Sequence, residues 1–114
     1  YTREFVIENP EGQFLVSLGN WEGTIAEVTV NGTPATVIAF PPYQSNVTDL
    51  IKSGINKIEV KVIGSLKNLL GPHFNNPSPG LVSPGHFRNV KSYPAGKDYQ
   101  LFDYGLMEDF QLLH

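Results

Sequence analysis

The chain has 114 residues, 40% of them hydrophobic, which is enough for the core of one domain. It contains no cysteine, so neither disulfides nor a thiolate metal site is expected. The eight basic residues are scattered and the net charge is −3, which argues against nucleic acid as a partner; no apolar run approaches the roughly 20 residues of a membrane span, which argues against a membrane. The sequence opens at Tyr1 directly on a strand-like pattern without a signal peptide, so we expect a segment of a longer polypeptide.

Most of the first two-thirds of the chain alternates apolar and polar residues with the period of two that is typical of half-buried strands. Phe5 and Ile7 share one face of the first expected strand, and Val6 lies on the opposite face. Residues 13–19 and 24–30 follow the same rule. The side chains expected to face the core in these two segments are Phe14, Val16, Leu18, Ala26, Val28 and Val30.

Asn31-Gly32 predicts a tight turn that follows the strand ending at Val30. Both residues tolerate the positive φ angles that a two-residue type I′ turn requires. The return strand is expected over residues 35–40. It should end at Pro41-Pro42, because proline supplies no backbone N–H to a sheet.

The middle of the chain combines a short helical segment with another strand. Residues 48–53 are expected to form one or two helical turns, with Gly54 in the left-handed position after the helix and Ile55 folded back on Leu50 as in a Schellman motif. Residues 56–64 alternate again. The side chains of this strand that should face inward are Ile58, Val60 and Val62.

A second helical turn is expected before Gly71, after which the periodic pattern is lost over a long segment. Alternation returns at residues 99–104, and Gly105 marks a bend or bulge there. Phe110 and Leu112 then share one face of a last strand.

About seven short strands and two brief helical turns predict an all-β fold, a jelly-roll β-sandwich that forms a single domain over residues 1–114. A complete jelly roll normally needs a longer chain. We therefore expect one or two strands to be missing on the N-terminal side.

Several stretches resemble the sugar-binding-like jelly-roll domain of family 2-type glycoside hydrolases. Residues 1–7 resemble an early strand of that domain, residues 14–32 its paired strands up to a "VNG" turn, and residues 41–62 the pattern in which an aromatic residue precedes "DVTDLL", a glycine and "NxxxVxV". Asn46 stands where that pattern usually has Asp. Residues 64–114, with "GSLKNLLGPH" and "DYGLMEDFQLL", resemble the C-terminal β-sandwich of large bacterial polysaccharide-degrading enzymes, including α-L-rhamnosidase-like ones.

The resemblance implies a galactose-binding-domain-like sandwich that serves as a non-catalytic accessory domain of a bacterial glycoside hydrolase. In such enzymes catalysis belongs to a separate domain, usually a barrel, against which the sandwich packs. The implied partner is the remainder of the parent hydrolase, and the implied location is periplasmic or extracellular. Some of these sandwiches bind carbohydrate, so polysaccharide is a second implied partner and a carbohydrate-binding module is the alternative function.

The residues themselves favour no catalytic centre. Glycoside hydrolysis needs two carboxylates across a sugar, but Glu108 and Asp109 are neighbours that a strand would point to opposite faces, and Asp103 joins either only through tertiary contact. The three histidines lack ligand-like spacing, and no serine has a nucleophile context. We therefore expect no catalysis by this chain alone and no cofactor. A structural Ca²⁺ bound by backbone carbonyls leaves no sequence signature and stays open.

Aromatic side chains are the one class that suggests a ligand. Sugars stack their C–H faces on aromatic rings, and tyrosine and tryptophan also hydrogen-bond hydroxyls. The aromatic residues and histidines expected to contact carbohydrate are Trp21, Tyr43, His73, His86 and Tyr93. For Trp21 the competing interpretation is packing at the rim of the core, which aromatic residues serve more often.

Leu69–Phe87 is a long connection rich in proline and glycine, and loops of this length are usually functional or disordered. Its apolar residues, among them Phe74 and Phe87, favour a loop that is ordered by packing against the sandwich or a neighbouring catalytic domain. Three functions stay open: an accessory packing domain, a binding module with a coplanar aromatic platform, and a free-standing enzyme. The sequence favours the first.

Overall fold

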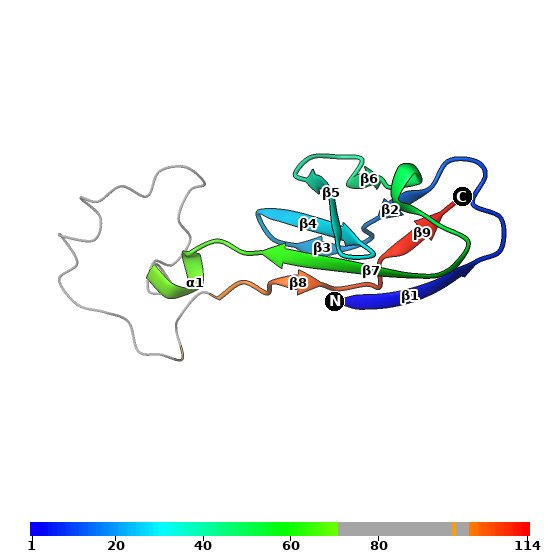
Figure 1. The fold of residues 1–114 in the computed structure, drawn as a ribbon. Coiled ribbons are helices and arrows are strands. Elements are labelled where there is room, and N and C mark those ends of the chain that lie inside the picture. Colours follow the sequence, from blue (N-terminus) through cyan, green and yellow to red (C-terminus); the bar gives the residue numbers. More distant parts are fainter. Residues whose placement is uncertain (71–96, 98–100) are drawn as a thin grey trace. The chain divides into compact units, whose positions relative to one another are not determined.

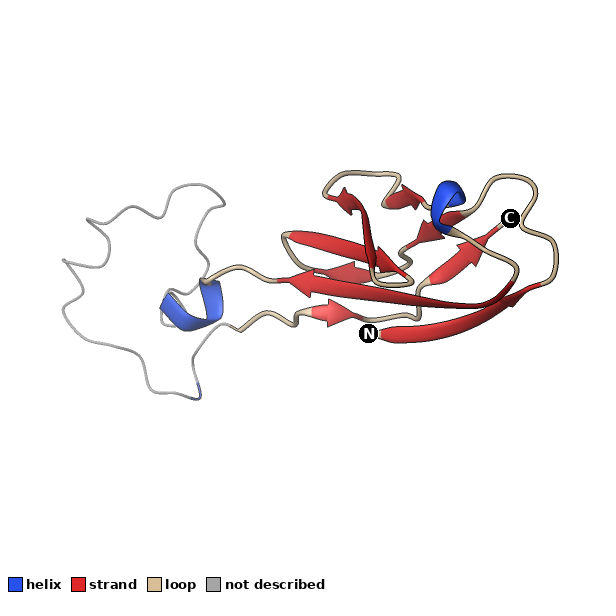
Figure 2. Cartoon of the chain, in the orientation of Figure 1, coloured by secondary structure: helices blue, strands red, loops and turns tan. Residues whose placement is uncertain are grey.

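The structure is a computed structural model that describes residues 1–70, 97 and 101–114. The chain divides into two compact units, one of Tyr1–Gly64 with Tyr104–His114 and one of Ser65–Asp103. The first unit is a β-sandwich, as predicted (Figure 1; Figure 2). Its strands are β1 (Thr2–Ile7), β2 (Leu15–Ser17), β3 (Trp21–Glu22), β4 (Ile25–Val30), β5 (Thr33–Ile38), β6 (Gln44–Asn46), β7 (Gly54–Ile63), β8 (Gly105–Leu106) and β9 (Gln111–Leu113).

The strands pair antiparallel in three sheets. One has four strands in the order β1-β7-β4-β5, one has three in the order β6-β2-β9, and β3 pairs with β8. Side chains of the four-stranded and three-stranded sheets meet in a single core. The long strand β7 lies inside the larger sheet between β1 and β4 and pairs antiparallel with both (Figure 1).

The period-two pattern predicts correctly which side chains face the core. Phe5 and Ile7 are half-buried and pack against the core, whereas Val6 between them is 72% exposed. Leu112 also packs against the core. The fully buried apolar residues come from both layers and are Phe14, Val16, Leu18, Ala26, Val28, Val30, Ile38, Val47, Ile58, Val60 and Phe110.

The Asn31-Gly32 turn is confirmed. The two residues have φ angles of 52° and 83°, and Val30 and Thr33 on either side of them are paired. The return strand β5 begins and ends two residues earlier than expected. Its register against β4 shifts between Glu27 and Thr29, which makes a β-bulge.

The predicted helical segment is shorter than expected. Only η1 (Thr48–Leu50) is helical, as a single 3₁₀ turn, and Ile51 is already extended. Gly54 has the expected positive φ of 91°, but it is the first residue of β7 and pairs with Ile7. Ile55 is 59% exposed on the outer face of the sheet, so the predicted Schellman motif is wrong.

The buried side chain of Asn56 explains this early end of the helix. Its Nδ2 donates to the carbonyls of Lys52 and Gly54 at 2.7 and 3.2 Å, and its Oδ1 accepts from the Lys52 N–H at 2.9 Å. The same Oδ1 accepts from Nδ2 of Asn31 at 2.9 Å, and this Nδ2 also donates to the Leu50 carbonyl. These bonds satisfy backbone groups that further helical turns would otherwise have satisfied.

The strand predicted over residues 99–104 is wrong where the structure describes it, because residues 101–104 have no regular secondary structure. The physical reason lies at Phe102, whose N–H donates to Oδ1 of Asn68 at 2.9 Å and whose carbonyl accepts from Nδ2 of Asn68 at 2.6 Å. A side-chain amide therefore takes the place of a partner strand. Gly105, the expected position of a bend or bulge, has a φ of 124°, but it lies in β8 and pairs with Glu22.

Asn68 belongs to α1 (Lys67–Leu70), the short helix of the second unit, at the place where a helical turn was predicted. Most of the long connection Leu69–Phe87 lies outside the described residues, so its packing stays a prediction. In the described part of the chain, no helix is long and apolar enough to span a membrane.

Candidate carbohydrate-contact site

Of the five residues predicted to contact carbohydrate, the structure describes Trp21 and Tyr43. It brings them together although they are 22 positions apart in the sequence. Their ring centroids lie 5.5 Å apart with an interplanar angle of 84°, an edge-to-face contact. Such pairs stabilise a fold by about 0.5–1.5 kcal/mol beyond their buried area. His73, His86 and Tyr93 lie outside the described residues, so their role stays a prediction.

Both rings are half-buried and pack against the core. Trp21 begins β3 and pairs with Leu106 of β8. Its ring lies close to the backbone of Gly23, where an added Cβ would come within 2.9 Å of Trp21 Cζ3 and 2.6 Å of Val62 Cγ1. The site therefore requires a glycine under the indole ring, and this close fit holds Trp21 as a packing residue at the rim of the sandwich.

A reverse turn positions Tyr43. Its N–H donates to the Phe40 carbonyl at 3.1 Å across Pro41-Pro42, whose peptide bond is cis, and its carbonyl accepts from the Leu18 N–H at 3.0 Å. Tyr43 has a φ of 57°, which is uncommon for a residue other than glycine. The turn leaves the ring of Phe40 81% exposed, the highest exposure among the large hydrophobic residues that the structure describes.

Trp21, Tyr43 and Phe40 are connected by the Trp21–Tyr43 ring contact and the Phe40–Tyr43 backbone bond, and we call these three residues the aromatic corner. The aromatic corner can offer apolar contact to a ligand but lacks catalytic groups of its own. A flat platform needs coplanar rings, and the one pair whose angle is defined is perpendicular. Sequence reasoning missed Phe40. The signal that could have found it was the Phe-Pro-Pro-Tyr run, in which two prolines end a strand next to an aromatic residue.

The acidic residues do not form a pair across a cleft in the described structure. Glu108 accepts the N–H of Asn20 at 3.1 Å and so fixes a loop. Asp109 is 87% exposed, 3.8 Å from the guanidinium of Arg3. Asp103 is also exposed and belongs to the other unit. Among the described residues, no three histidine or acidic side chains gather as a metal site would require.

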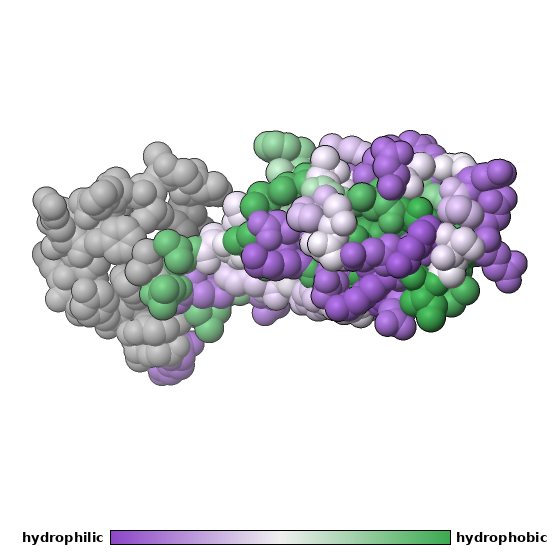
Figure 3. Space-filling model, in the orientation of Figure 1, coloured by the Kyte–Doolittle hydropathy of each residue, from purple (hydrophilic) through white to green (hydrophobic). Residues whose placement is uncertain are grey.

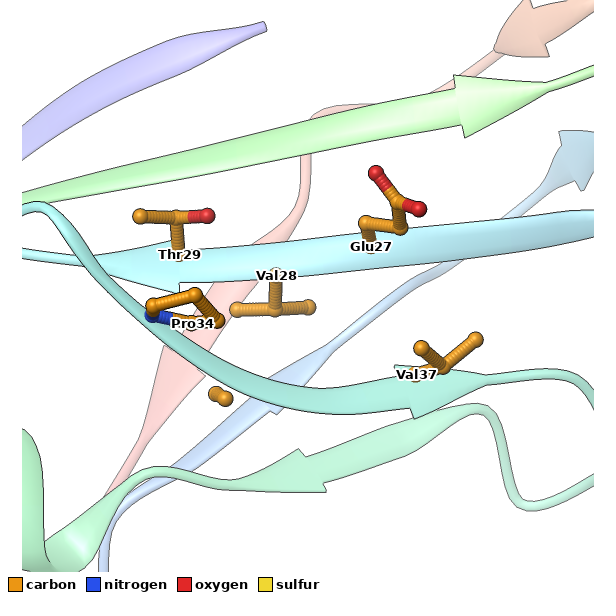
Figure 4. Close-up of a pocket in the computed structure, with 6 residues that line it drawn as sticks. Glu27, Val28, Thr29, Pro34 and Val37 are labelled. Atoms are coloured by element: carbon orange, nitrogen blue, oxygen red, sulfur yellow. The ribbon is translucent and has the colours of Figure 1, made fainter.

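A groove on the larger sheet follows the β-bulge of β5 (Figure 4). Its polar side chains are Glu27 and Thr29 of β4, and the Glu27 carboxylate already accepts from Nζ of Lys61 at 3.0 Å. The rest of the lining is apolar, with Pro34 and Val37 from β5. A single, already paired carboxylate does not provide the two groups that glycoside hydrolysis needs.

No family model matches the chain, and no curated protein matches its sequence. Among solved structures, it is similar to part of the rhamnosidase from Novosphingobium sp. PP1Y, with a TM-score of 0.67 and 22% sequence identity. The similarity covers 98% of this chain and 10% of that one, so the chain spans about a tenth of the length of that rhamnosidase. The similarity shows that this chain has the fold of a segment found in a rhamnosidase. The finer resemblance to galactose-binding domains stays a prediction.

Proposed function

We propose that the chain is a non-catalytic accessory β-sandwich domain of a bacterial glycoside hydrolase, located in the periplasm or outside the cell. In this role it packs against the rest of its polypeptide and needs no cofactor. One observation carries the proposal: nearly the whole chain has the fold of a segment that makes up a tenth of a rhamnosidase. A segment of that size leaves most of such an enzyme to form the catalytic domain.

The placement of the acidic side chains supports a non-catalytic role. In the described part of the chain, Glu108 is engaged with the backbone of Asn20, and Glu27 is paired with Lys61. Neither lies opposite a second carboxylate across a cleft, as the acid and the base or nucleophile of a glycosidase must. Glu108 therefore holds a loop in place, and Glu27 forms an ion pair on the surface of a sheet.

The first test has two measurements. The purified 114-residue chain should release no sugar from aryl α-L-rhamnosides or from a panel of polysaccharides, and robust hydrolysis that disappears in Asp103→Ala or Glu108→Ala would refute the proposal. In source cells, an antibody raised against the chain should detect a product far larger than the 12.6 kDa of the chain itself. A native product of only that size would also refute it.

The second candidate function is a carbohydrate-binding module, and the observation that favours it is the 81% exposure of Phe40, whose carbonyl accepts from the N–H of Tyr43. Titration calorimetry against plant and bacterial polysaccharides separates the two. An accessory packing domain gives no heat of binding. A binding module gives a dissociation constant of about millimolar to micromolar, which Phe40→Ala, Trp21→Ala or Tyr93→Ala abolishes without unfolding the chain.

A further inference from the structure

The strand β1 differs from the other edge strands of the sandwich. β5, at the opposite edge of the same sheet, carries Pro34 and a β-bulge, and β6 and β9 have only three residues each. Short strands, prolines and bulges are the usual means by which proteins protect a sheet edge. β1 has six residues in unbroken register with β7 and no proline, so among the edge strands that the structure describes it has the backbone most open to a further strand.

The hydrogen-bonding pattern shows which backbone groups of β1 are available. Tyr1 and Val60 exchange two hydrogen bonds, of 3.0 and 2.9 Å. Because directly opposed residues in an antiparallel pair alternate between bonded and non-bonded, every second residue after Tyr1 bonds to β7, and the residues between them direct their N–H and C=O groups outward. The residues with outward-directed groups are Thr2, Glu4 and Val6, and no backbone bond joins them to another part of the chain that the structure describes.

The outer face of this edge has both a charge and an apolar patch. Val6 pairs with Ile55, and the two are 72% and 59% exposed, so they place apolar surface on this edge. Figure 3 shows that the surface of the sandwich carries hydrophobic patches beside bands of hydrophilic residues. Glu4 pairs in register with Lys57, but Nζ of Lys57 lies 3.0 Å from the carboxylate of Glu59 instead. Among the described residues, Glu4 has no ion-pair partner.

We propose that β1 accepts an additional antiparallel strand from elsewhere in the same native polypeptide, with a basic residue opposite Glu4 and an aliphatic residue opposite Val6. This inference rests on the proposed function. A second copy of the chain fits less well, since the two-fold register that uses all three outward residues, centred on Glu4, would place like charges opposite each other. One short free strand would bind with only about millimolar affinity, whereas a tethered segment has an effective concentration in that range or above.

The first experiment titrates a capped heptapeptide, acetyl-TVVKTVT-amide, into the isotope-labelled 114-residue chain and follows backbone amides by NMR. The largest shifts should occur at Thr2, Glu4 and Val6. Val6→Pro removes an outward N–H without removing a bond to β7 and should weaken binding at least tenfold, whereas Val6→Thr keeps this donor and should bind normally. Glu4→Lys should bind a peptide with glutamate in place of lysine more tightly than the original peptide. This second variant tests the same pairing without placing a proline in β1.

Absence of binding at about 10 mM peptide, equal binding by Val6→Pro in a spectrum that shows a native fold, or shifts centred away from β1 would overturn the inference. The second experiment compares deuterium uptake of Thr2–Ile7 in the chain and in the native polypeptide. We expect uptake at least tenfold slower in the native polypeptide. Equal uptake in a native product much larger than this chain would refute the added strand and leave the proposed function standing, whereas a native product of 12.6 kDa would refute the proposed function itself.

Discussion

Asn56 provides the sharpest test of how this sandwich is held together. The residue is fully buried, and its side-chain amide makes four hydrogen bonds of 2.7–3.2 Å that join β7, the segment after η1 and the Asn31 turn. Asn56→Ala removes all four and leaves the Lys52 N–H and two carbonyls without these partners. Each such bond contributes about 0.5–1.5 kcal/mol, so the loss of four should lower the free energy of unfolding by about 2–6 kcal/mol.

Urea unfolding followed by circular dichroism measures this loss, and the midpoint of thermal unfolding should fall by roughly 8–25 °C for a chain of this size. Asn9→Ala is the matched control, because Asn9 is exposed and bonds only within its own turn to Glu11; its effect should stay within about 0.5 kcal/mol. Asn56→Asp preserves the shape but replaces the donor to two carbonyls by an acceptor. It should destabilise at least as much as Asn56→Ala, and a neutral effect would refute the account of the network.

Three further predictions concern packing and charge, each measured by urea unfolding of the same chain. Phe110→Ala should lower the free energy of unfolding by about 3–5 kcal/mol, because the ring is 1% exposed in the shared core; a loss below 1 kcal/mol would contradict that placement. Gly23→Ala should cost about 1–3 kcal/mol because its Cβ would collide with Trp21 and Val62, and a neutral substitution would show that this contact is loose. Lys61→Ala breaks an exposed ion pair with Glu27 and should lower the free energy of unfolding by less than about 1 kcal/mol; a larger loss would contradict the exposed placement of this pair.

The features that the sequence predicted are those determined by local patterns. Alternation fixed which face of each strand is buried, because a shift of one residue would expose Val28 and bury Glu27. Asn31-Gly32 predicted its turn because these two residues adopt positive φ at little cost. In both cases the physical constraint lies within a few residues of sequence, so it can be read without knowing the rest of the fold.

The errors arose where a side chain replaced backbone partners. Asn56 ends the helical segment by bonding Lys52 and Gly54, and Asn68 takes the place of a strand partner for Phe102. Propensity scales give asparagine no such role, because the effect depends on which backbone groups lie within reach after folding. The Asn68–Phe102 contact joins residues 34 positions apart, which no local window includes.

The candidate site was partly predictable for a related reason. Trp21 and Tyr43 were chosen as aromatic residues near loops, but their contact depends on the turn that gives Tyr43 a positive φ and on the bare backbone of Gly23 beneath the indole. The perpendicular pair leaves no shared flat face for a sugar. A ligand at the aromatic corner would therefore have to use the exposed side chain of Phe40 first. Substitutions therefore distinguish a binding role from a packing role. If the residues only pack, replacing Trp21 or Tyr43 should destabilise the fold, whereas replacing the exposed Phe40 should have no effect on stability or binding.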